Sequence, residues 1–234
     1  MAIVPAGVFA PPHPADFEWE ETNYLQYFHF LPTVLHDRLL NLSHNANLAL
    51  AIGSANWILA RFAAWDDDRK AWDFVNAVWA EMSEDYACTH YYPPDDEWRG
   101  PIRGSIVTAM TILFDALDER GNNPTMADRS TWMDNFAHHV ITPIGPYEIW
   151  FEQIVRRFER THSWEAEGWP KPDLFDDRFP QGRVLSPEAL DPEIDYRPEA
   201  APDALRRYVD RLRRDGNLFV LDADEVADSQ GRRR

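Results

Sequence analysis

Apolar residues recur every three or four positions along most of the chain. The clearest stripe lies within residues 48–62 and consists of Leu48, Ala51, Ile52, Ala55, Ile58, Leu59 and Phe62. This spacing places these side chains on one face of an α-helix. Shorter stripes of the same kind predict further helices within residues 34–42, 72–82, 102–117, 130–140, 147–158 and 205–212. The pattern therefore predicts an all-α, or nearly all-α, protein.

The order of these helices is compatible with two arrangements. The first is an antiparallel helical bundle, since short polar connections join successive helices. The second is a short αα-hairpin repeat, because the helix at 48–62 and the Trp72 helix are echoed by the helix at 102–117 and the Trp132 helix. Only two such pairs are visible and their offset is not constant, so both arrangements stay open.

Both ends of the chain depart from the helical pattern. Residues 1–32 begin proline-rich and continue with aromatic residues, which predicts an extended arm that packs across the body. Residues 163–202 are also proline-rich but keep many large apolar side chains, which predicts an extended wrap ahead of a short C-terminal helix. We therefore expect one structural domain made of an arm (1–32), a helical body (33–162) and a wrap with its helix (163–234). Trp57 lies off the best stripe, so we expect either the arm or an interface to cover it.

Charge narrows the choice of partners. Asp and Glu number 40 and Lys and Arg number 23, which gives a formal net charge of −17 at pH 7. A surface this negative repels phosphate backbones and anionic lipids, which argues against direct nucleic-acid binding and against membrane binding. Cys88 is the single cysteine, and the N-terminus lacks the basic start of a signal peptide. Together with an arginine-rich, lysine-poor composition, these features predict a cytoplasmic bacterial protein.

Familiar catalytic and phosphate-binding motifs are absent from the sequence, and no cofactor is predicted. The remaining chemical candidates are His36, His44 and His138. His36 and His44 are eight residues apart, so they would share a face of one continuous helix. Asp134 precedes His138 by four residues and is a candidate ligand or orienting carboxylate. We consider these histidines weak metal candidates and expect most of them to be ordinary core or helix-end residues.

The most distinctive candidate surface is the loop predicted for residues 85–101. Its partner-binding candidates are His90, Tyr91, Tyr92, Asp95, Asp96, Glu97, Trp98 and Arg99. Tyr, Trp and Arg are enriched at the energetic centres of interfaces, and the acids beside them suit a basic partner. The plainer interpretation is a packed connector with solvated charges.

We therefore expect a non-enzymatic, protein-binding module from a bacterium, in its specific form an immunity- or antitoxin-type inhibitor of a basic toxin or nuclease. Electrostatic attraction between an acidic inhibitor and a basic enzyme speeds their association and selects the right partner. Two alternatives stay open. One is an accessory or scaffold subunit of a bacterial complex. The other is an enzyme whose histidine and carboxylate site lies between helices.

Overall fold

The computed structural model describes residues 4–10, 15–89, 91, 93, 97–118, 126–170, 180–225 and 227. These residues form eight α-helices, several 3-10 turns and one two-stranded sheet, which confirms the nearly all-α prediction. The choice between a bundle and a hairpin repeat stays a prediction. In the described part of the chain, every helix falls short of the length or apolarity needed to cross a membrane.

The elements follow one another in a simple order. The α-helices are α1 (Thr33–Leu39), α2 (His44–Phe62), α3 (Arg69–Ala77), α4 (Gly100–Asp118), α5 (Met126–Val140), α6 (Gly145–Thr161), α7 (Trp164–Glu167) and α8 (Ala201–Arg214). The 3-10 turns are η1 (Tyr24–Tyr27), η2 (Val78–Met82), η3 (Pro187–Leu190) and η4 (Pro198–Ala200). The strands are β1 (Tyr86–Cys88) and β2 (Val220–Asp222).

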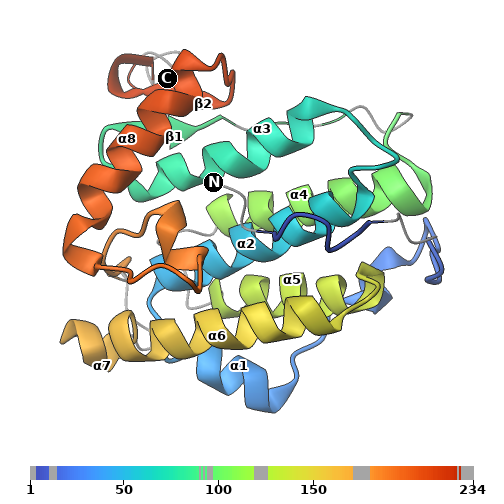
Figure 1. The fold of residues 1–234 in the computed structure, drawn as a ribbon, viewed down its shortest axis with the longest axis horizontal. Coiled ribbons are helices and arrows are strands. Elements are labelled where there is room, and N and C mark those ends of the chain that lie inside the picture. Colours follow the sequence, from blue (N-terminus) through green and yellow to red (C-terminus); the bar gives the residue numbers. More distant parts are fainter. Residues whose placement is uncertain are drawn as a thin grey trace.

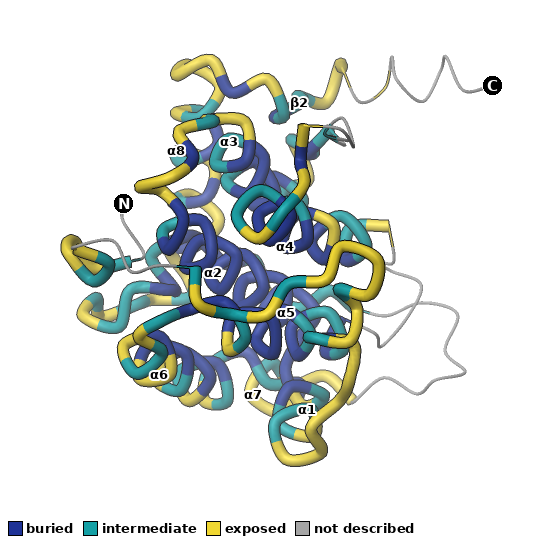
Figure 2. The backbone as a smooth tube through the Cα atoms, turned by 90° about the vertical axis from the view of Figure 1, so that its right-hand side faces the viewer, coloured by how far each residue is buried: buried dark blue, intermediate teal, exposed yellow. Residues whose placement is uncertain are grey.

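Helix α2 forms the centre of the molecule. It packs against α3, α4, α5 and α6, and Figure 1 shows α3 on one side of it and α5 and α6 on the other. Nearly all of its residues are buried, as Figure 2 shows, although the apolar stripe predicted only one buried face. Its small residues allow this close approach. A Cβ atom on Gly53 would collide with the Trp150 ring of α6, so glycine lets these two helices meet.

The acidic turn before α3 acts as a helix cap. The side chain of Asp68 accepts a hydrogen bond from the Lys70 amide at 2.9 Å, the usual role of an aspartate at a helix N-cap. Asp66 is buried and accepts 2.7 and 2.9 Å hydrogen bonds from Arg103 Nε and the Asp68 amide. The turn therefore fixes the start of α3 and ties it to α4.

The N-terminal arm covers the core. Phe9 meets Trp57 edge-on, with ring centroids 6.1 Å apart, and Trp57 is fully buried against Tyr147 and Trp150. The first of the two alternatives for Trp57, cover by the arm, is therefore the one that the structure shows.

The proline-rich segment lies on α6 where it is described. Leu185 and Leu190 are fully buried, and Arg157 of α6 donates hydrogen bonds of 2.7–3.1 Å to four main-chain carbonyls of residues 189–194. This segment is neither α-helix nor sheet, so its carbonyls lack the regular main-chain hydrogen bonds of those elements, and the guanidinium group provides donors for them. Beyond α8, β2 pairs antiparallel with β1, with Cys88 opposite Val220, so the end of the described chain returns to the predicted loop.

Candidate binding surface and cavities

Residues 15–21, here called the acidic strap, present carboxylates in a row. Asp16, Glu18 and Glu20 are exposed, whereas Phe17 and Trp19 between them are half-buried. This period of two is typical of an extended chain, in which successive side chains point to opposite sides. The strap therefore directs its aromatic side chains inward and its acidic side chains to solvent.

The two aromatic residues hold the strap in place. Phe17 packs edge-on against Phe62, with ring centroids 6.0 Å apart, and against His139 at 5.4 Å. Trp19 lies directly over Gly104 of α4, where a Cβ atom would collide with the indole ring. The ring nitrogen Nε2 of His139 also lies 2.7 Å from the Glu18 carbonyl, which accepts its hydrogen bond. Burial lowers the pKa of His139, which favours the neutral ring here.

The carboxylates of the strap have different electrostatic surroundings: the charge of Asp16 acts on the Arg61 guanidinium, whose pKa it raises against the larger lowering by burial. Within the described residues, no basic side chain forms an ion pair with Asp16, Glu18, Glu20 or Glu21, whereas Arg38 is paired with Glu152 and Glu159. Glu21 instead accepts hydrogen bonds from Trp19 Nε1 at 2.8 Å and from the Gly100 amide at 3.0 Å. The second of these bonds joins the strap to the end of the predicted loop.

The predicted loop is described only in part. His90, Tyr92, Asp95 and Asp96 lie outside the described residues, as do their predicted roles. Tyr91 is half-buried, with its ring centroid 5.1 Å from that of Phe219. Trp98 is buried, with the Arg103 guanidinium 5.4 Å from its ring centroid.

Glu97 and Arg99 are exposed, so the described end of the loop presents charge outward and aromatic rings inward. Its role in partner binding stays a prediction.

A cavity of about 490 Å³ separates the strap from this loop. It is lined by Trp19, Glu21, Thr22, Tyr24, Pro93, Trp98, Arg99, Gly104, Val107, Thr108 and Thr111. A smaller cavity of about 210 Å³ shares Tyr24, Thr108 and Thr111 with it. The strap, the loop end and the larger cavity together form one candidate surface, here called the strap surface. Tryptophan, tyrosine and arginine side chains lie there near the carboxylates of the strap.

The three candidate histidines lie in different surroundings. His36 belongs to α1 and bonds Asp128 at 2.6 Å, whereas His44 begins α2 and packs against Trp164 with ring centroids 5.5 Å apart. The two do not share a face of one helix, because α1 ends at Leu39. Among the described residues, no three His, Cys, Asp or Glu side chains are placed to hold a metal ion.

His138 is the exposed end of a buried polar chain between α5 and α6. Its Nδ1 and Nε2 atoms lie 3.5 Å from Asp134 and 3.4 Å from Glu148. Asp134 accepts a 2.8 Å hydrogen bond from the Tyr147 hydroxyl, which lies 2.9 Å from Ser54 Oγ. Burial raises the pKa of Asp134 to about 6, although His138 and Tyr147 oppose that rise. Asp134 and Tyr147 line none of the cavities described here.

Comparison with protein-family models, with curated proteins and with solved structures finds no match for this chain. Functional inference therefore rests on the residues themselves. The sequence did not single out the strap; it predicted that the aromatic residues of the arm pack across the body. Its signal was nevertheless present, since acidic and aromatic residues alternate at positions 16–20.

Proposed function

We propose that this chain is a non-enzymatic bacterial module that binds a basic protein, in the manner of an immunity or antitoxin-type inhibitor acting in the cytoplasm. One observation carries the proposal: an anchored strap holds Asp16, Glu18 and Glu20 in solvent, and its other residues Trp19 and Glu21 line a cavity together with Trp98 and Arg99. The cavity matters because an acidic cluster alone is an ordinary solvated surface.

The anchoring of the strap favours binding. Carboxylates on a free tail would lose conformational entropy when a partner orders them, whereas Phe17 and Trp19 have already fixed this segment. Carboxylates two residues apart along an extended chain are roughly 7 Å apart. A row of lysine or arginine side chains on a partner can pair with them one by one.

The cavity offers a partner aromatic contacts in addition to charge. A lysine or arginine of the partner that enters it would place its alkyl chain against Trp19 and Tyr24 and its charge near Glu21. Exposed ion pairs contribute only about 0.2–1 kcal/mol each, so most of the affinity would come from this aromatic pocket. The negative strap would chiefly raise the association rate, by about 10-fold or more at low salt.

The test compares capture by three forms of the full chain from a bacterial lysate. The strap variant carries Asp16→Lys, Glu18→Lys and Glu20→Lys. The matched control carries Glu165→Lys, Glu193→Lys and Glu199→Lys, which are exposed acids on the wrap. Both variants change the net charge by the same amount, from −17 to −17 + 6 = −11.

We expect the wild type and the control to retain the same single basic protein, released by salt, and the strap variant to lose it. Equal retention by both variants would show that overall charge acts rather than the strap. Several proteins retained together by all three forms would favour the scaffold alternative, and empty captures would contradict binding.

The scaffold alternative has one observation in its favour. Leu25, Phe30, Leu31 and Val34 are all exposed, with Val34 reaching 80% exposure. Large apolar side chains that gather within ten residues are typical of a contact surface for another subunit. The enzyme alternative rests on the Asp134–His138 pair, whose buried carboxyl group has a raised pKa.

A further inference from the structure

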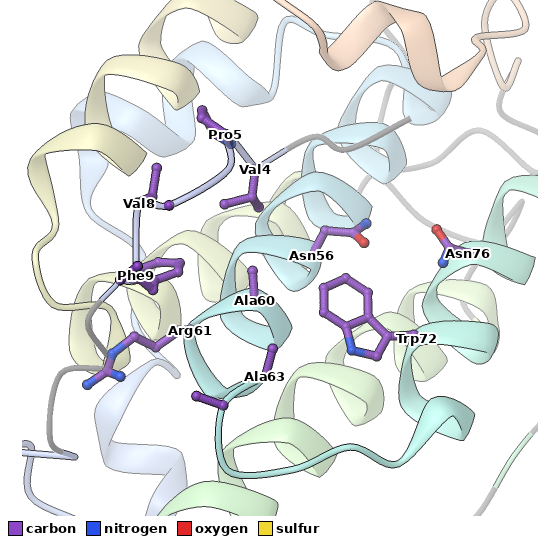
Figure 3. Close-up of a pocket in the computed structure, with 13 residues that line it drawn as sticks. Val4, Pro5, Val8, Phe9, Asn56, Ala60, Arg61, Ala63, Trp72 and Asn76 are labelled. Atoms are coloured by element: carbon purple, nitrogen blue, oxygen red, sulfur yellow. The ribbon is translucent and has the colours of Figure 1, made fainter.

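A third cavity lies between the N-terminal arm, α2 and α3. Residues 4–10 form one wall, Asn56 and Ala60 of α2 form the floor, and Trp72 and Asn76 of α3 form the far wall (Figure 3). Its volume is about 530 Å³, which lies within the range of pockets that take small organic ligands. We call it the arm cavity.

Small residues at the C-terminal end of α2 and just beyond it create this space. Ala60, Ala63 and Ala64 line the cavity where longer side chains would fill it. Val4, Val8 and Phe9 of the arm face them, so most of the lining is apolar. The Trp72 ring supplies a flat aromatic wall (Figure 3). A flat, largely apolar molecule fits these surroundings, because aromatic faces pack best against other flat groups.

Two side-chain amides form a polar edge of the cavity, one offering a hydrogen-bond acceptor and the other a donor. Asn56 donates its Nδ2 hydrogen to the Ile52 carbonyl at 2.9 Å, which leaves its Oδ1 atom as an acceptor. Asn76 accepts a 2.9 Å hydrogen bond from the Tyr208 hydroxyl at Oδ1, which leaves its Nδ2 group as a donor. Burial raises the pKa of Tyr208, so its hydroxyl stays protonated and keeps donating.

The two amide groups face the same part of the cavity. Figure 3 shows the amide groups of Asn56 and Asn76 directed toward each other above the Trp72 ring. It also shows the guanidinium group of Arg61, the charged residue of the lining, directed away from Trp72 and toward the arm. The polar edge is therefore neutral, with one acceptor and one donor.

We infer that the arm cavity binds a small, neutral, flat molecule that carries an amide-type edge, with an N–H donor beside a carbonyl acceptor. The ligand N–H would donate to Asn56 Oδ1, and its carbonyl would accept from Asn76 Nδ2. A purely apolar ligand would exclude water from Asn56 Oδ1 and Asn76 Nδ2 without bonding to them, which costs free energy. An anion or cation would lose its hydration without gaining an opposite charge at this edge.

This inference is independent of the proposed function, since the arm cavity and the strap surface share no lining residue. Because residues 4–10 form a wall of the cavity, a bound ligand would also hold the arm against α2. Binding should therefore slow proteolysis of the arm, which gives a second readout.

The probe is 2-quinolone, a neutral bicyclic lactam with the required edge. Calorimetric titration of the full chain compares it with quinoline, which lacks the N–H donor and the carbonyl, and with 2-naphthoate, which is charged. We expect 2-quinolone to bind at least about tenfold more tightly than either, as the loss of hydrogen bonds to buried groups implies.

Two variants test the geometry. Asn76→Asp keeps the acceptor for Tyr208 but removes the donor, and should weaken 2-quinolone binding about tenfold or more. Ala60→Phe fills the space and should abolish binding. The control is Asn23→Asp, an exposed asparagine outside the cavity, which should bind as the wild type does. Unfolding midpoints show that each variant is folded.

Three results would overturn the inference. They are no 2-quinolone binding by the wild type at millimolar concentration, equal binding of quinoline and 2-quinolone, and unchanged binding by a folded Ala60→Phe variant. Tighter binding of 2-naphthoate would likewise refute the neutral edge.

Discussion

His162 at the end of α6 is expected to make the folded state sensitive to acid. Its side chain is fully buried, with ring centroids 5.5 Å from Phe158 and 5.8 Å from Tyr196. Its Nδ1 atom lies 2.7 Å from the Thr161 hydroxyl, and within the described residues its Nε2 atom has no hydrogen-bond partner. Burial, assisted by the nearby charge of Arg183, lowers the pKa of His162 from 6.5 to about 4.

The sign and size of the effect follow from proton linkage. Between pH 6.5 and pH 4 the unfolded chain binds a proton at His162 that the folded chain does not bind. The free energy of unfolding therefore falls as the pH drops through this window, and the full contribution is present above pH 6.5. A pKa lowered from 6.5 to about 4 corresponds to roughly 3 kcal/mol.

The assay is urea unfolding of the wild type and of His162→Phe at pH 7, 5.5 and 4. Phenylalanine suits the aromatic surroundings and cannot take up a proton. We expect the free energy of unfolding of the wild type, relative to the variant, to decrease by roughly 2–3 kcal/mol from pH 7 to pH 4. The difference between the chains removes the titration of every other group.

The variant His29→Phe, at an exposed position, is the control for losing a histidine elsewhere. A difference between the wild type and His162→Phe that stays constant from pH 7 to pH 4 would show that burial does not lower the pKa of His162.

Two further predictions concern Asp134 and Gly104. The folded state retains a proton on Asp134 between pH 3.8 and about 6, so stability declines as the pH rises through that window. Asp134→Asn should therefore gain roughly 1–3 kcal/mol of stability at pH 7 and little at pH 4 in urea unfolding, and equal gains at both would contradict this. Gly104→Ala should displace the Trp19 ring, cost roughly 1–3 kcal/mol and speed proteolysis of the strap. A Cβ atom on Gly145 would meet no neighbouring atom, so Gly145→Ala should neither lower stability nor speed proteolysis of the strap. Identical proteolysis of the two variants would count against Trp19 as the anchor of the strap.

The helices were predictable because their signals are local. The stripe of residues 48–62 lies within α2, as its spacing predicted. The near-complete burial of α2 was not predictable from the stripe. It depends on the arm, α5 and α6, which approach from distant parts of the sequence, and small residues such as Gly53 merely permit them to do so.

The candidate surface was predictable only in part. The loop of residues 85–101 drew attention through its composition, and Glu97 and Arg99 are indeed exposed at its end. Its neighbour, the strap, is joined to it by a hydrogen bond between Glu21 and Gly100, residues 79 positions apart. No local pattern indicates such a contact. The pairing of Asp134 with Tyr147 is equally hidden, since it joins two helices across a turn.

The association rate with the captured basic protein, measured at low and moderate salt, decides whether the strap is the contact surface. Wild type, strap variant and control variant are compared by stopped flow. If the strap is the contact surface, the strap variant should associate at least about tenfold more slowly than the control at low salt, and the difference should shrink as salt rises. Equal association rates for the two variants, which have the same net charge, would show that the strap is not the contact surface.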